Sequence, residues 1–110
     1  MIVDLDELKL VNDAQGHAAG DALIVRAGSA LREVARSLDI VARLGGDEFG
    51  ILSAECARAG AEALLKRVRT ALTEANVKAS MGLAMRDPAV GLEGACLSAD
   101  KLMYEEKRSR

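Results

Sequence analysis

The segment Arg43-Leu44-Gly45-Gly46-Asp47-Glu48-Phe49-Gly50-Ile51-Leu52 joins two apolar runs through a pair of glycines and a pair of carboxylates. A Gly-Gly pair between strand-like runs predicts a tight β-hairpin, because both residues can take the positive φ that such turns require. Two acids at a hairpin tip repel each other, so folding alone gives little reason for them. A bound divalent cation supplies a reason, since carboxylate oxygens are the ligands that Mg²⁺ prefers.

The residues around this hairpin predict an α+β fold. Apolar runs predict strands at residues 1–5, 40–44, 49–52 and 77–84. Helical periodicity predicts a short helix that ends near Gly16 and longer helices at residues 19–37, 57–75 and 92–107. The order is β-α-β-β-α-β with an appended helix, which is the ferredoxin-like pattern with a mainly antiparallel sheet. One domain of residues 1–110 is expected, since this length supports a single core.

This topology predicts an acidic site between segments that are far apart in the chain. The first strand lies beside the third and antiparallel to it, so its carboxyl end meets the hairpin that leads into the third strand. Asp4 closes the first strand and Asp47 lies in that hairpin. We therefore expect the two carboxylates to be neighbours at one edge of the sheet.

The segment Asp4-Leu5-Asp6 has three interpretations. An EF-hand loop is excluded, because Leu8 stands where an oxygen ligand is needed. A phosphatase with an aspartyl nucleophile begins in the same way but needs a longer α/β chain. The third is the two-carboxylate Mg²⁺ site of nucleotidyl transfer, with Asp4 and Asp47 on a triphosphate-bound metal. For Asp6 alone, a solvated acid at a strand end is favoured.

The stretch from Lys9 to Asp21 places a cation, an amide, glycines and an acid just after the first strand. Backbone N–H groups at a helix that follows a strand suit phosphates. Asn12 and Asp21 could read a base edge, because a carboxylate accepts from the N1–H and 2-amino groups of guanine. The alternative is a helix–loop–helix with Gly16 as its C-cap, in which His17 is a structural hydrogen-bonding residue.

Composition excludes several classes of function. Phe49 and Tyr104 are the only aromatic residues, which argues against single-stranded nucleic-acid binding, because that uses aromatic stacking platforms. No apolar run approaches membrane-spanning length, so no membrane contact is expected. The formal charge of −2 is typical of an ordinary soluble domain. We expect a cytoplasmic protein in which Cys56 and Cys96 are reduced.

Four stretches together resemble the GGDEF family of diguanylate cyclases. They are the pattern from Asp4 to Asp21, the segment Arg43 to Phe49, the pair Ser80-x-Gly82, and Ala99-Asp100-x-x-Met103-Tyr104-x-x-Lys107. The resemblance implies an architecture related to nucleotide-cyclase and polymerase palm domains. It also implies that two GTP molecules are joined into cyclic di-GMP with release of two pyrophosphates, across a transient homodimer.

The resemblance further implies roles for the acidic hairpin. Asp4 and Asp47 would be ligands for Mg²⁺ or Mn²⁺, with the Leu5 carbonyl nearby. Glu48 would be a metal-site acid or the proton acceptor for the attacking 3′-hydroxyl. The hairpin glycines would leave room for the nucleotide against the turn; these are Gly45 and Gly46.

By the same resemblance, Asn12 and Asp21 would read guanine, and Lys9 and Lys107 would contact the triphosphate. These pairings suit phosphoryl-type transfer, which depends mostly on positioning and on neutralising charge.

An Arg-x-x-Asp pair, Arg36 and Asp39, precedes the hairpin. It matches the inhibitory site at which cyclic di-GMP binds members of the family, and an arginine fork suits phosphate oxygens and purines. The alternative function is therefore an inactive module that binds cyclic di-GMP or GTP as a regulatory receptor. Two features depart from the family pattern: Leu8 replaces a usual Phe, and the helix usual before the first strand is absent. Because no large apolar dimer interface is evident, weak self-association is expected, together with sensory or regulatory domains in a longer protein.

Overall fold

The computed structural model describes residues 1–53 and 57–109. Its elements, in chain order, are β1 (Ile2–Leu5), α1 (Leu8–Gln15), α2 (His17–Val34), β2 (Asp39–Arg43), β3 (Glu48–Ser53), α3 (Arg58–Glu74), β4 (Ala79–Gly82) and α4 (Gly91–Arg108). The strands form one antiparallel sheet in the order β2-β3-β1-β4. The expected β-α-β-β-α-β core with an appended helix is confirmed.

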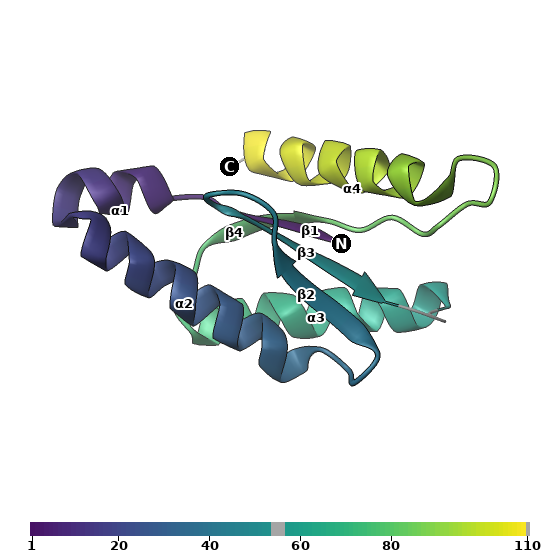
Figure 1. Cartoon of the computed structure of the whole chain (residues 1–110), viewed down its shortest axis with the longest axis horizontal. Helices are drawn as coiled ribbons and strands as arrows, with labels where there is room; N and C mark the ends of the chain where they lie inside the picture. The colour runs from purple at the N-terminus through teal and green to yellow at the C-terminus, as the bar shows by residue number, and fades with distance from the viewer. Residues whose placement is uncertain (54–56, 110) are drawn as a thin grey trace.

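Helices cover both faces of the sheet: α2 and α3 lie on one face and α4 on the other (Figure 1). Successive residues of a strand point to opposite faces. In β1, Val3 and Leu5 therefore join the core under α2 and α3, whereas Ile2 packs with Ala99 and Met103 of α4. The main core includes Val3, Leu5, Leu31, Phe49, Ile51, Leu64, Val68, Leu72 and Met81.

The helix α4 approaches the sheet closely at Gly82. A methyl group at this position would collide with the backbone of Ala99 and Met103. The absence of a side chain at Gly82 therefore lets α4 lie directly on β4 and β1. This contact sets the height of α4 above the carboxyl end of β1.

The hairpin between β2 and β3 differs from its prediction. It is a four-residue loop, residues 44–47, and neither Gly45 nor Gly46 takes the left-handed backbone expected of a tight turn. The Arg43 guanidinium shapes the loop instead, because it donates to the carbonyl oxygens of Gly45 and Gly46 at 2.9 Å each. The Leu44 amide closes the loop by donating to the Glu48 carbonyl at 2.8 Å.

Some element boundaries also differ. A single residue separates α1 from α2, because Gly16 at φ 89° breaks the helix where a longer loop was expected. The strand predicted at residues 77–84 is confined to the four residues of β4.

Cys96 is free and exposed, whereas Cys56 lies outside the described residues. Among the described residues, no helix is long and apolar enough to span a membrane.

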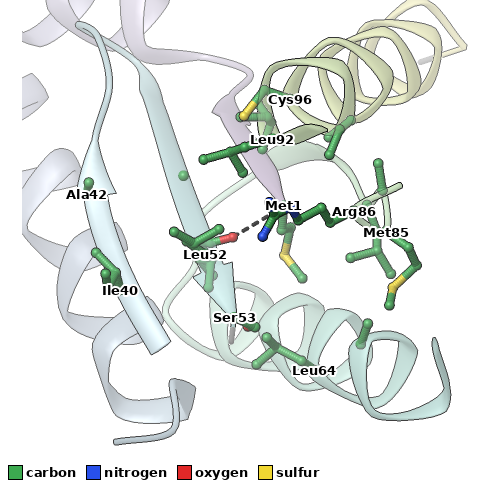
Figure 2. Close-up of a pocket in the computed structure, with 18 of the residues that line it drawn as sticks. Met1, Ile40, Ala42, Leu52, Ser53, Leu64, Met85, Arg86, Leu92 and Cys96 are labelled. Atoms are coloured by element: carbon green, nitrogen blue, oxygen red, sulfur yellow. Dashed lines mark hydrogen bonds between the residues drawn. The ribbon is translucent and has the colours of Figure 1, made fainter. Parts of the chain in front are cut away.

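An apolar groove of about 890 Å³ lies beside α4, where this helix leaves β2 and part of β3 uncovered. Ile40 and Ala42 of β2 line one side, and Leu92 and Cys96 of α4 line the other (Figure 2). The predicted acidic site does not line this groove. The chemistry therefore has to be sought at the end of β1.

Candidate active site

Three polar residues form a row across the sheet on the face that α4 covers. Asp4 in β1 is paired in register with Glu48 of β3 on one side and with Ser80 of β4 on the other. Asp4 is only 8% exposed, and Ser80 is fully buried. A buried carboxylate requires compensation by charge or hydrogen bonds, so the partners of Asp4 decide what this row can do.

The main partner of Asp4 comes from the last turn of α4. The Lys107 ammonium donates to Asp4 Oδ1 at 2.5 Å and lies 3.8 Å from Asp6 Oδ1. The Ser80 hydroxyl donates to the same Asp6 oxygen at 2.6 Å. The structure thus places Lys107, expected at a triphosphate, directly on the acids at the end of β1.

The hairpin loop is attached to the same end of β1. The Leu5 amide donates to the Asp47 carbonyl oxygen at 2.8 Å, so the expected meeting of these two segments takes place. The backbone of Asp47 makes this contact, and its side chain is half-buried. Asp4, Leu5 and Asp47 therefore share one edge of the sheet, while their roles as metal ligands stay predictions.

The electrostatics of this edge reflect a shortage of positive charge. Burial raises the pKa of Asp4, and the charges of Asp47 and Asp6 add to this rise, while Lys107 opposes it. Desolvation lowers the pKa of Lys107, but the hydrogen bond and charge of Asp4, followed by the charges of Asp6 and Asp47, raise it overall. One ammonium therefore serves several carboxylates.

Glu48 experiences the same negative field. Burial raises the pKa of this carboxyl, and the charges of Asp100, Asp4 and Asp47 raise it further, against the opposing charge of Lys107. An additional cation at this edge would relieve the repulsion among these groups.

The donor set fits a magnesium ion that is held partly by its substrate. Within residues 1–53 and 57–109, no group of three or more His, Cys, Asp or Glu side chains is placed to hold a metal alone. Mg²⁺ is commonly bound through one or two carboxylates together with the phosphates of a nucleotide. A pair of carboxylates such as Asp4 and Asp47 is compatible with that mode of binding, and the predicted role of the Leu5 carbonyl stays a prediction.

The predicted guanine readers, Asn12 of α1 and Asp21 of α2, belong to two helices that pack on each other. The Asn12 side chain lies against Gly20, so that any side chain at position 20 would collide with it. Asp21 follows Gly20 directly and is exposed, as is Lys9 on α1. The Asn12 Oδ1 atom is buried and has no hydrogen-bond partner within the described part of the chain. This oxygen packs against Gly20, so the Asn12 side chain would have to turn before it could accept a hydrogen bond from a ligand.

The loop glycines are not explained by folding. A methyl group added at Gly45 or Gly46 would meet no atom within 4 Å, and neither residue needs a left-handed backbone. Glycine at both positions therefore leaves open space beside Asp47. This is consistent with the prediction that the two residues make room for a nucleotide.

Arg36 and Asp39 already bind each other at the opposite end of β2 from the hairpin loop. The Arg36 amide donates to Asp39 Oδ2 at 2.7 Å, and its guanidinium lies 3.2 Å from Asp39 Oδ1. Burial opposes the ionisation of Asp39, but hydrogen bonds from Arg36 and Ser53 lower its pKa overall. The Arg36 side chain is 44% exposed and remains accessible to a ligand.

Glu106 also lies in this region, although no sequence motif predicts a role for it. Glu106 precedes Lys107 and binds both α3 and β4. The signal that could have pointed to it is its position in the last turn of α4, where the helix dipole disfavours acids.

Residues 1–110 match the family model described as "Diguanylate cyclase, GGDEF domain". The chain belongs to the GGDEF family. It is 38% identical over 117 residues to the bifunctional diguanylate cyclase/cyclic di-GMP phosphodiesterase MucR of Pseudomonas aeruginosa, which covers 97% of this chain and 17% of the relative. The chain spans between 7% and 35% of the length of three curated relatives that it matches.

Solved structures agree with the family. The GGDEF domain of TpbB from Pseudomonas aeruginosa is similar at a TM-score of 0.85 and 32% identity, covering 99% of this chain and 74% of that one. The coiled coil and GGDEF domain of DgcB from Caulobacter crescentus, in complex with c-di-GMP, is similar at 0.90 and 26% identity, covering 98% and 63%. The α+β fold with a four-stranded antiparallel sheet is thus that of GGDEF domains.

Proposed function

We propose that this GGDEF domain is a diguanylate cyclase that joins two GTP molecules into cyclic di-GMP and releases two pyrophosphates. The observation that carries the proposal is the hydrogen bond from the Leu5 amide to the Asp47 carbonyl. It places the buried carboxylate of Asp4 and the hairpin carboxylate at one edge, next to two glycines that folding does not require.

Asp4 and Asp47, with the Leu5 carbonyl, would hold Mg²⁺ or Mn²⁺ together with the nucleotide phosphates. When bound, this ion would neutralise charge on the phosphates and stabilise the transferring group. Lys107 already supplies positive charge at Asp4, and it would contact the triphosphate of a nucleotide bound at this edge. Its contact with Asp4 keeps the ammonium ordered before the nucleotide arrives.

The nucleotide would extend from this edge toward α1 and α2. Lys9 is exposed on α1 and would bind phosphate oxygens. The exposed Asp21 carboxylate, and Asn12 once its side chain turns away from Gly20, would accept hydrogen bonds from guanine, whose N1–H and 2-amino groups are donors. Adenine lacks this pair of donors, so the arrangement favours GTP.

In each of two equivalent steps, the 3′-oxygen of one GTP would form a bond to the α-phosphorus of the other. The bond from that phosphorus to the pyrophosphate oxygen would break, and pyrophosphate would leave with the electron pair. The hydroxyl proton would pass to Glu48, which is in register with Asp4. Because one domain holds one GTP, two domains must face each other, most simply through two-fold symmetry.

Calorimetry with a non-hydrolysable GTP analogue would test the site without turnover. We expect Mg²⁺-dependent binding that weakens roughly tenfold or more when the ion is removed or when an ATP analogue is used. Equal affinity for the ATP analogue would contradict the guanine assignment of Asn12 and Asp21. Binding that did not depend on Mg²⁺ would contradict the metal assignment of Asp4 and Asp47.

Arg36 and Asp39 suggest that the product restrains the domain or, in an inactive module, that cyclic di-GMP is a regulatory ligand. Arg36→Ala is expected to weaken cyclic di-GMP binding by about tenfold to a hundredfold, because it removes a charge-assisted contact to phosphate. Initial turnover should not fall, since this pair lies at the opposite end of β2 from Asp47. Unchanged affinity in calorimetry would make the pair a surface ion pair only.

Other domains of a longer protein are proposed to control the pairing of two GGDEF domains. The DgcB structure that resembles this chain includes a coiled coil, and a similar element would be a suitable dimerising partner. The cytoplasmic location expected from the sequence stays a prediction.

A further inference from the structure

A three-residue contact surrounds the outer edge of the sheet next to the candidate site. Glu106 of α4 accepts a hydrogen bond from the Met81 amide of β4 through Oε2 at 2.5 Å. Its other oxygen, Oε1, forms an ion pair with Arg69 of α3 at 2.5 Å. Because α3 and α4 lie on opposite faces of the sheet, this Arg69–Glu106–Met81 contact joins both helices around β4 (Figure 1).

The contact is well suited to fix Glu106. Met81 belongs to β4, which is an edge strand, so its outward amide has no neighbouring strand to bind in the described sheet. A carboxylate that binds both this amide and an arginine forms two charge-assisted hydrogen bonds, which are stronger than neutral ones. The Glu106 side chain is 23% exposed, so water weakens the pair less than on an open surface.

The next residue along α4 is Lys107, and the two side chains diverge from the same helical turn. Successive residues on an α-helix are rotated by about 100°. Glu106 therefore reaches outward to the edge of β4, whereas Lys107 reaches over β1 to Asp4. Any rotation or fraying of this turn would move both side chains together.

Without the contact, the last turn of α4 would be held less firmly. The close approach at Gly82 fixes the helix at Ala99 and Met103, which lie one turn or more before Lys107. Helix ends open more readily than helix centres, because fewer buried contacts hold them. The Arg69–Glu106–Met81 contact supplies an anchor where the helix would otherwise begin to fray.

We propose that Glu106 is a positioning residue: by binding Arg69 and the Met81 amide, it fixes the last turn of α4 and so holds the Lys107 ammonium at Asp4. The consequence for nucleotide binding rests on the proposed function, because there Lys107 contacts the triphosphate. The consequence for the order of Lys107 does not depend on that function.

The test compares Glu106→Ala with the unaltered protein by NMR and calorimetry. We expect faster hydrogen exchange of the Met81 amide and loss of the ordered ¹⁵N signal of the Lys107 ammonium. Affinity for the Mg²⁺-bound GTP analogue should fall roughly threefold to tenfold. In a Lys107→Ala background, Glu106→Ala should cause no further loss, since it acts through that ammonium.

Two further variants keep the test decisive if Glu106→Ala fails to fold. Glu106→Gln retains an acceptor for the Met81 amide but loses the charge that attracts Arg69, and Arg69→Ala removes the same ion pair from the other side. Each variant should make the Lys107 ammonium less ordered and so weaken its ¹⁵N signal in part. Glu62→Ala is the matched control, because it breaks the exposed ion pair between Arg58 and Glu62 on α3 and should leave Lys107 unchanged.

Separate outcomes bear on the two proposals. An unchanged Lys107 signal in folded Glu106→Gln and Arg69→Ala proteins would overturn the positioning role, whatever the nucleotide does. A further loss of affinity caused by Glu106→Ala in the Lys107→Ala background would also overturn it. If the Lys107 signal is lost while the unaltered protein binds no GTP analogue, positioning is supported and the proposed function fails.

Discussion

Asp47→Ala is expected to lower the rate of cyclic di-GMP formation by about a hundredfold or more, while the domain stays folded. The backbone carbonyl of Asp47, which the substitution retains, ties the loop to Leu5. No side chain or backbone group within residues 1–53 and 57–109 forms a hydrogen bond with the half-buried carboxylate, so its loss should change the free energy of unfolding by no more than about 0.5 kcal/mol. Product analysis after incubation with GTP and Mg²⁺, together with thermal unfolding, measures both effects.

A matched control is Asp13→Ala, which removes an exposed aspartate from α1. It should leave turnover close to that of the unaltered protein. Normal turnover in Asp47→Ala would show that the metal assignment is wrong. A folding defect in this variant would instead make the Asp47 carboxylate structural.

The second large effect concerns two domains acting together. The specific rate, per domain, is expected to rise with protein concentration, because each domain supplies one GTP and neither can present both reactants in line. Fusion to a dimerising coiled coil should raise the rate at low concentration by about 10² or more, as a linked partner has an effective concentration near the millimolar range. Rate measurements across a dilution series, with the oligomeric state determined at each point, provide the test.

The same fusion carrying Asp47→Ala controls for effects of the coiled coil itself and should remain inactive. If the specific rate stays flat on dilution in a species shown to be monomeric, the mechanism with two half-sites is excluded.

The topology of the sheet could be predicted because the element order leaves few arrangements. Short apolar runs for the strands and a period of about 3.6 in the helices indicate β-α-β-β-α-β, and that order places β1 beside β3. The meeting of Asp4 and the Asp47 hairpin follows from this pairing alone. Local spacing would never have connected residues so far apart.

The form of the hairpin could not be predicted in the same way. A Gly-Gly pair suits a turn with positive φ at both residues, yet neither Gly45 nor Gly46 takes that backbone. The Arg43 guanidinium decides this, because it binds the carbonyl oxygens of Gly45 and Gly46. Such a contact depends on the conformation of the Arg43 side chain, which the preference of glycine for positive φ cannot predict.

The contact between Lys107 and Asp4 could not be predicted from the sequence pattern either. Its reach to Asp4 depends on how closely α4 packs on the sheet, which the missing side chain of Gly82 permits. The anchor at Glu106 depends on Arg69, which comes from a helix on the other face. Periodicity indicates which face of a helix is apolar, but not the height at which that face packs.

The most direct measurement follows both products that the protein forms from GTP with Mg²⁺, at a protein concentration high enough for two domains to meet. An α-phosphate label reports cyclic di-GMP, and a separate assay reports the released pyrophosphate. The account predicts cyclic di-GMP and pyrophosphate in a ratio of one to two, lost in Asp47→Ala and absent when ATP replaces GTP. Binding of the GTP analogue without any cyclic di-GMP, even in the coiled-coil fusion, would contradict it and would make the domain a nucleotide receptor.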